Sequence, residues 1–153
     1  VNKNEEGQWE VVGDPTEGAL VVAAGKSGFT RKNAKQEGYQ ELKEIPFSSE
    51  EKRMAVYYQM PDGSQEVIVK GSPAVLIANC SQFETDEDPV PLDDLVKQRI
   101  NNDNKELAGN GLRVLALGYK PVKSTEENAY NDLIFIGLVG IMDPPRKETA
   151  NII

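Results

Sequence analysis

The chain has 153 residues, of which 39% are hydrophobic and 27% are charged, and its formal net charge is −8. That composition predicts one globular domain with a core of useful size rather than a disordered segment. The acidic balance argues against a nucleic-acid partner and against docking on anionic lipid, because both need a basic footprint, although a local pocket can still attract a small anion.

The residue types that are missing narrow the chemistry further. There is no histidine, which removes the usual general base and every histidine-ligated metal site. Cys80 is the single cysteine, so no internal disulfide can form, and the sequence fits a reducing compartment. No apolar stretch approaches the length of a membrane span, and there is no signal peptide. From the first residue, Val1, and the last three, 151–153, we expect a segment of a longer protein.

A short strand is predicted from Gln8 to Val12, followed by a helix. Asp14 can cap that helix, with proline at its first position and Glu17 at its third, which is a capping-box arrangement. The apolar run 19–24 continues the helix, and a glycine at 25 or 28 ends it.

A β-hairpin is predicted next. A strand that starts at about Lys52 places alternate residues on one face: Met54, Val56, Tyr58 and Met60. The turn over 61–64 has the Asp-Gly signal of a hairpin, and the return strand covers 65–70. A serine–proline pair then begins a helix over 72–80.

An acidic loop and a long helix follow. The loop over 84–91 contains three adjacent acids at 86–88, but it lacks the glycine and the spacing of a calcium loop, so we expect a solvated surface run. The helix stops at 109–111, and one side of it carries Leu92, Leu95, Val96, Ile100 and Leu107.

Two strands complete the pattern. The segment 112–119 alternates, and 133–142 is almost wholly apolar, which predicts a central strand covered on both faces until 143–146 ends it sharply. Antiparallel hairpins with helices between them indicate an α+β fold: a twisted, mainly antiparallel β-sheet flanked by helices.

Two short matches are attributed to chance. The sequence GKS at 25–27 looks like the end of a phosphate-binding P-loop, but Leu20 stands where the first glycine is required, and the preceding residues form an apolar helix. The sequence NCS at 79–81 matches a glycosylation sequon, yet nothing indicates secretion.

Four segments carry possible chemistry, and each also has a purely structural explanation. In GDPTEGAL, residues 13–20, Glu17 either caps its own helix or accepts a hydrogen bond from an adenine amino group. In PFSSEEKRM, residues 46–54, Phe47 either belongs to the core or offers a purine a stacking surface, with Lys52 five residues later to meet phosphates.

The other two segments place a cation beside apolar or backbone groups. In KGSPA, residues 70–74, Lys70 is either a surface lysine before an ordinary helix cap or a cation that meets an anion beside free N–H groups. In GLRVLALGYK, residues 111–120, Arg113 shares a strand face with two leucines. It is either an edge residue with a solvated head or a phosphate-binding group.

In this order, the four segments and the closing GIMDPPRKE resemble successive signatures of the P-type ATPases that pump cations, over nearly the whole chain. KGSP and GLRVLAL followed by DPPR are the specific parts, and GDPTEGAL is moderately specific. The resemblance implies a nucleotide-binding domain over 1–142 and the start of a hinge strand over 143–153, returning to a phosphorylation domain that is absent here. The hinge positions would be Asp143, Pro144, Pro145 and Arg146.

The resemblance also implies an ATP pocket lined by eight positions: Glu17, Phe47, Lys52, Met54, Lys70, Gly71, Arg113 and Leu115. Glu17 would contact the adenine, Phe47 would stack on it and Arg113 would reach the phosphates. The two lysines would line the pocket, while Met54 and Leu115 would supply apolar walls.

Two departures and two absences qualify this expectation. Many members of the family have arginine where this chain has Ser49, which predicts one weaker phosphate contact, and many have glutamate at Ala74, which we expect to affect helix capping more than binding. No DKTGT phosphorylation motif and no aspartate-rich magnesium motif is present. We therefore expect ATP binding without hydrolysis or metal binding by this chain alone, although the full pump would need Mg²⁺.

The implied parent is a pump of the calcium or sodium-potassium kind, since zinc and copper pumps carry a His-Pro pair in this domain. This domain would lie on the cytoplasmic side of a membrane, monomeric by itself, and would work with phosphorylation, actuator and transmembrane domains. Two alternatives stay open. A nucleotide-free interaction or regulatory domain has Ser49 as its only support in the sequence, and a free-standing phosphohydrolase is opposed by the missing motifs.

Overall fold

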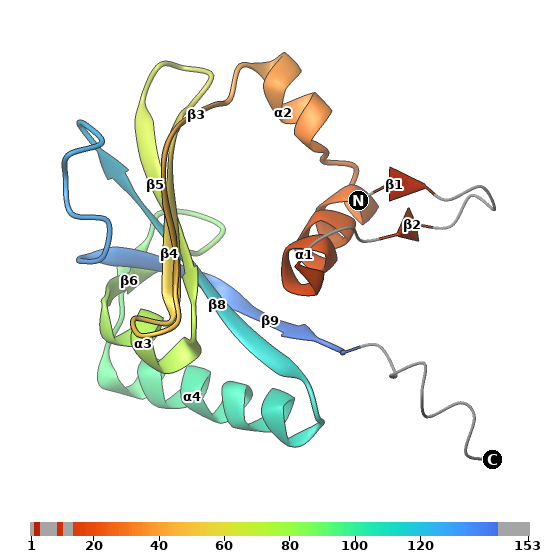
Figure 1. Ribbon diagram of the computed structural model, residues 1–153. Coiled ribbons are helices and arrows are strands. Elements are labelled where there is room, and N and C mark those ends of the chain that lie inside the picture. Colours follow the sequence, from red (N-terminus) through yellow and green to blue (C-terminus); the bar gives the residue numbers. More distant parts are fainter. Residues whose placement is uncertain (1, 4–8, 11–13, 144–153) are drawn as a thin grey trace, which may run out of the picture.

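The computed structural model describes residues 2–3, 9–10 and 14–143. Its centre is a seven-stranded sheet in the order β3-β4-β5-β8-β9-β6-β7 (Figure 1). All neighbouring strands are antiparallel except β6 and β9, which are parallel. The strands are β3 (Gln40–Ser48), β4 (Arg53–Gln59), β5 (Gln65–Gly71), β6 (Cys80–Phe83), β7 (Val90–Pro91), β8 (Arg113–Val122) and β9 (Leu133–Ile141).

Helices lie on both sides of this sheet (Figure 1). On one side α3 and α4 pack against β5, β8 and β9, and on the other side α1 and α2 stand beside the sheet. A separate two-stranded ribbon near α1 joins β1 (Asn2–Lys3) to β2 (Trp9–Glu10). The helices are α1 (Pro15–Lys26), α2 (Arg31–Glu37), α3 (Pro73–Ala78) and α4 (Asp94–Gly109).

The core lies between the sheet and the two helices α3 and α4. Alternate residues of β4 and β5 point to this side and are almost completely buried, as the period of two in a strand requires. Leu76 of α3 and Leu133 of β9 pack in the same cluster. The loop 123–132 covers this side further, since the Tyr57 hydroxyl donates a 2.6 Å hydrogen bond to the carbonyl of Glu127. Among the residues with described burial, no polar or charged side chain is buried.

The α+β prediction, with a mainly antiparallel sheet flanked by helices, is confirmed. The start of α1 is confirmed too, because the Asp14 carboxylate accepts a 2.7 Å hydrogen bond from the backbone N–H of Thr16 and proline occupies the first turn. The strand predicted over 8–12 is described only as β2, and its other residues lie outside the described ranges. No helix of the described residues has the length and apolar character needed to cross a membrane.

Two burial predictions are wrong. Ile136 in β9 is 48% exposed, so this strand is not covered on both faces along its whole length, because α3 and α4 pack on one face only. Leu95 is 67% exposed, because it lies about 100° around α4 from Val96, and the buried stripe passes through Val96 and Ile100.

Five elements have no counterpart among the predictions: α2, β3 and the short strands β1, β6 and β7, the last of which lies in the segment expected to be a loop. The signals for α2 are present in the sequence. Thr30 is its N-cap and accepts a hydrogen bond from the N–H of Asn33, and Gly38 ends it with a left-handed φ of 100°. Strand β3 has a weaker signal because it is an edge strand, and its charged residues obscure the alternation.

Candidate functional site

Two adjoining cavities lie between α1 and the sheet. Their volumes are about 660 Å³ and about 230 Å³, and they share Asp14, Glu17, Phe47, Met54 and Lys70. Together they fall in the size range of small-molecule sites, which are concave and mostly apolar with a few polar groups.

The floor of these cavities is the face of the sheet opposite the core. Met54 lies directly across from Lys70 on β5, and Lys70 lies across from Leu117 on β8, so the three residues form a row over three neighbouring strands. Val56 and Ile68 form a second cross-strand pair in the larger cavity. The floor is therefore mainly apolar, with Lys70 on its middle strand and Tyr58 on β4 as its polar members.

Phe47 forms one wall of both cavities. It lies on the edge strand β3, and 61% of its surface is exposed. The alternative that Phe47 belongs to the core is therefore wrong. An aromatic ring exposed beside a cavity is available to stack on a planar ligand.

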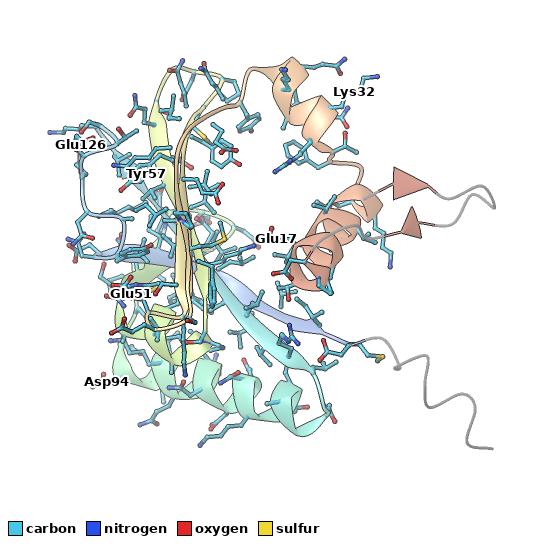
Figure 2. All side chains as sticks on the ribbon, in the orientation of Figure 1. Glu17, Lys32, Glu51, Tyr57, Asp94 and Glu126 are labelled. Atoms are coloured by element: carbon cyan, nitrogen blue, oxygen red, sulfur yellow. The ribbon has the colours of Figure 1, made fainter. Side chains whose placement is uncertain are left out.

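Glu17 and Lys70 join α1 to the floor through an ion pair. Figure 2 shows Glu17 on the side of α1 that faces the sheet. The Lys70 side chain is only 17% exposed, and burial lowers the pKa of its ammonium, while the carboxylate of Asp14 acts in the opposite direction. The structural explanation given for Glu17 in the sequence analysis was that it caps its own helix. That explanation does not include this ion pair with Lys70.

Gly71 follows Lys70 at a point where two chain segments nearly touch. A Cβ atom at Gly71 would lie 2.6 Å from the carbonyl oxygen of Lys52 and 2.9 Å from the Cβ of Arg53. Glycine is therefore required by close backbone approach, and its missing side chain lets β5 pass under the β3–β4 turn.

Arg113 is the first residue of β8 and lines the smaller cavity together with Leu115. One terminal nitrogen donates a 3.0 Å hydrogen bond to the hydroxyl of Thr16, and the other donates a 3.2 Å hydrogen bond to the carboxylate of Asp143. The guanidinium thus lies between the first turn of α1 and the chain that leaves β9.

The structure brings together seven of the eight predicted pocket residues: Glu17, Phe47, Met54, Lys70, Gly71, Arg113 and Leu115. Lys52 is not among the residues that line either cavity. It occupies the β3–β4 turn with a φ of 55°, and its carbonyl accepts a hydrogen bond from the N–H of Ser72. A role for its ammonium stays a prediction. The hinge positions Pro144, Pro145 and Arg146 lie outside the described residues.

The far end of the larger cavity carries charged residues that the sequence did not single out. Arg31 of α2 lies there with Glu41 and Glu44 of β3. Burial, followed by the negative charge of Glu41, raises the pKa of Tyr58 in the same region, while Arg31 acts against this shift. The sequence analysis did not identify this group, because it predicted neither α2 nor β3.

Among the described residues, no group of three or more His, Cys, Asp or Glu side chains is arranged to hold a metal ion. The acids at 86–88 are exposed, as expected of a surface run.

Comparison with known proteins gives a consistent result. Residues 1–148 match the family described as P-type ATPase, cytoplasmic domain N. The chain is 36% identical to a calcium-transporting ATPase of Bacillus subtilis, over 99% of this chain and 17% of that protein. It is 39% identical to a calcium-transporting ATPase type 2C member 2 of Mus musculus, over 94% of this chain and 15% of that protein.

A third relative is named for sodium and potassium rather than for calcium. The chain is 35% identical to a sodium/potassium exporting P-type ATPase of Schizosaccharomyces pombe, over 97% of this chain and 15% of that protein. The chain therefore spans about a sixth of the length of each of these relatives.

Proposed function

Because the chain belongs to the family of P-type ATPase cytoplasmic N domains, we propose that it binds ATP in the paired cavities between α1 and the sheet. The observation that supports this most directly is the convergence of distant segments. Residues from α1, α2, β3, β4, β5 and β8 line two adjoining cavities that combine an exposed aromatic ring, a mainly apolar floor and three cations, Arg31, Lys70 and Arg113.

Each of these groups has a distinct role in the proposal. Phe47 stacks on the adenine, which rests on the floor formed by Met54 and its neighbours. The partly buried Lys70 neutralises ligand charge and gives up its pairing with Glu17, whose carboxylate then accepts a hydrogen bond from the adenine amino group. Arg113, which lines the smaller cavity, contacts the phosphates with a planar fork of donors.

The proposed activity of the isolated chain stops at binding. Phosphoryl transfer needs a nucleophile and a metal, and the chain has no recognisable motif for either. In a complete pump, the chain would deliver ATP to an aspartate in another domain, with Mg²⁺ held there, on the cytoplasmic side of the membrane. The phosphorylation, actuator and transmembrane domains of that pump would be its partners, and the transported ion would be chosen by parts of the protein outside this chain.

An ATP titration followed by backbone amide NMR tests this proposal. We expect shifts to cluster at Glu17, Phe47, Lys70 and Arg113, with a dissociation constant of about 1 mM, because one stack and a few cations supply about 4–5 kcal/mol. Steady phosphate release should match a boiled control, and magnesium should change the affinity less than tenfold.

The same measurements decide between this function and its alternatives. Amide shifts that do not respond to ATP would favour a nucleotide-free interaction domain. Phosphate release above the boiled control would indicate a hydrolase, and a tenfold increase in affinity with magnesium would reveal a metal site, with the acids at 86–88 as its first candidates.

A further inference from the structure

The side-chain contacts of Arg113 link the proposed phosphate site to the chain that leaves β9. Its guanidinium donates to the Thr16 hydroxyl at 3.0 Å and to the Asp143 carboxylate at 3.2 Å. Thr16 is itself held by Asp14, which accepts its backbone N–H at 2.7 Å. One arginine therefore connects the start of α1, the start of β8 and the first residues after β9.

The position of Asp143 follows from the register of β8 and β9. Arg113 pairs directly with Ile141, the last residue of β9, and Ile141 is 8% exposed and so fixed in place. The chain then leaves the sheet. Met142 is 75% exposed, and the Asp143 side chain is 62% exposed. The contact with Arg113 is thus the one described side-chain ion pair that holds Asp143 after the ladder has ended.

A polyphosphate and the Asp143 carboxylate would compete for the same guanidinium. Both are anions, both accept hydrogen bonds from terminal N–H groups, and two anions on one arginine repel each other. The Arg113 side chain is 52% exposed, so its fork can turn from one partner to the other without unpacking the core.

We propose that Asp143 is a positioning residue that holds Arg113 while no phosphate is present, and that a bound nucleotide displaces Asp143 and releases the chain beyond β9. This inference rests on the proposed ATP binding and adds its regulation. Binding of a nucleotide in the cavity would thereby change the contacts of the chain after β9, because Arg113 is the cation that both anions share.

The direct test is Asp143→Asn in the 153-residue chain. Without the competing charge, the affinity for ATP should rise about two- to fivefold, which is the scale of an exposed ion pair. The affinity for adenosine, which has no phosphate, should stay the same. Asp103→Asn is the matched control, since it removes the same charge from an exposed position on α4 and should leave both affinities unchanged.

A double-mutant cycle separates displacement from simple repulsion. In an Arg113→Gln background, Asp143→Asn should give less than half of its usual gain in the free energy of ATP binding, because the shared cation is absent. An equal gain in both backgrounds would mean that Asp143 repels ATP through space, which would overturn the displacement. Thermal melting of each variant checks that the fold is intact.

Hydrogen exchange supplies a readout that affinity cannot. ATP should speed exchange at the backbone amides of Met142 and Asp143 in the parent chain, whereas in Asp143→Asn exchange should be fast already. ATP binding with no gain in Asp143→Asn, or with no change in exchange, would remove this inference and leave the proposed function intact. Failure of ATP to bind any variant would remove both.

Discussion

Strands β4 and β5 show one face to the core and the other to the cavities, and the two faces differ sharply in what they bury. On the core face, four alternate residues are each at most 1% exposed: Ala55, Tyr57, Val67 and Val69. On the cavity face, the intervening residues line an open depression: Met54, Val56, Tyr58, Ile68 and Lys70. Figure 2 shows Tyr57 and Glu17 on opposite sides of the sheet.

The difference comes from how the helices meet each face. On the core face, α3 packs against β5 and the loop 123–132 reaches Tyr57 of β4, so burial is almost complete and the Tyr57 hydroxyl is hydrogen-bonded. On the cavity face, the side-chain contacts described between α1 and the sheet are polar ones, Glu17 with Lys70 and Thr16 with Arg113. The core face is therefore expected to control stability, and the cavity face to control binding.

Leu133→Ala should have the largest effect and should act on stability alone. Leu133 is 0% exposed in the core cluster, and removing a buried leucine side chain costs about 2–5 kcal/mol. Denaturant unfolding measures the loss. Leu95→Ala is the matched control, because Leu95 is 67% exposed and should change stability by less than about 0.5 kcal/mol. Similar losses in both variants would contradict the division between the faces.

Gly71→Ala is the one variant of this series that should weaken both the stability of the domain and its binding of ATP. Its new Cβ would meet a backbone carbonyl at 2.6 Å, so we expect a loss of about 1–3 kcal/mol of stability together with weaker ATP binding. Gly109→Ala, in which the new Cβ meets nothing within 4 Å, should be neutral or slightly stabilising. Unfolding curves and ATP titrations of both variants check this, and a neutral Gly71→Ala would show that the turn moves aside freely.

Phe47→Ala should weaken binding without destabilising the domain. Stacking on a base is worth about 1–3 kcal/mol, so the affinity for ATP should fall about five- to hundredfold. The melting temperature should change little, since the ring is 61% exposed. Ile136→Ala is a suitable control, because Ile136 is 48% exposed and is not among the cavity residues. A large fall in melting temperature with unchanged ATP shifts would instead make Phe47 structural.

The Lys70 variants should have the smallest effect of this series. Lys70→Gln should lower the affinity for ATP about three- to tenfold, because one partly screened charge contact is worth about 1 kcal/mol, while stability stays the same or rises slightly. Lys70→Arg should also bind less well, since a planar fork does not replace a compact ammonium. Titration and melting of both variants measure this. Unaltered affinity in Lys70→Gln would reduce Lys70 to a structural partner of Glu17.

The lowered pKa of Lys70 adds a pH dependence of known sign. Burial favours the neutral amine, so the folded chain loses this proton at a lower pH than the unfolded chain. As the pH rises through the lowered pKa, the affinity for ATP should fall, while the contribution of Lys70 to stability should increase up to the unfolded value of about 10.5. Lys70→Arg should lack the fall in affinity, because a guanidinium stays protonated. ATP titrations across this alkaline range provide the check.

Much of the fold could be predicted from local patterns because those patterns have local causes. The proline after Asp14, the Asp-Gly turn before Gln65 and the alternation in β4 each specify their element without help from distant residues. The prediction was weaker where burial is decided by neighbours. The apolar run of β9 reads as a strand covered on both faces, but only the packing of α3 and α4 decides that Ile136 is exposed.

The sequence by itself also determined the residue types of the site, since an aromatic ring, a lysine before a glycine and an arginine on a strand are visible in the order of the chain. Only the tertiary structure decided which of them meet. It pairs Glu17 with Lys70, leaves Lys52 outside both cavities, and places Arg113 between Thr16 and Asp143. The physical reason is that helix caps and strand alternation act over a few residues, whereas a cavity is formed by side chains that the sheet register brings together from distant parts of the chain.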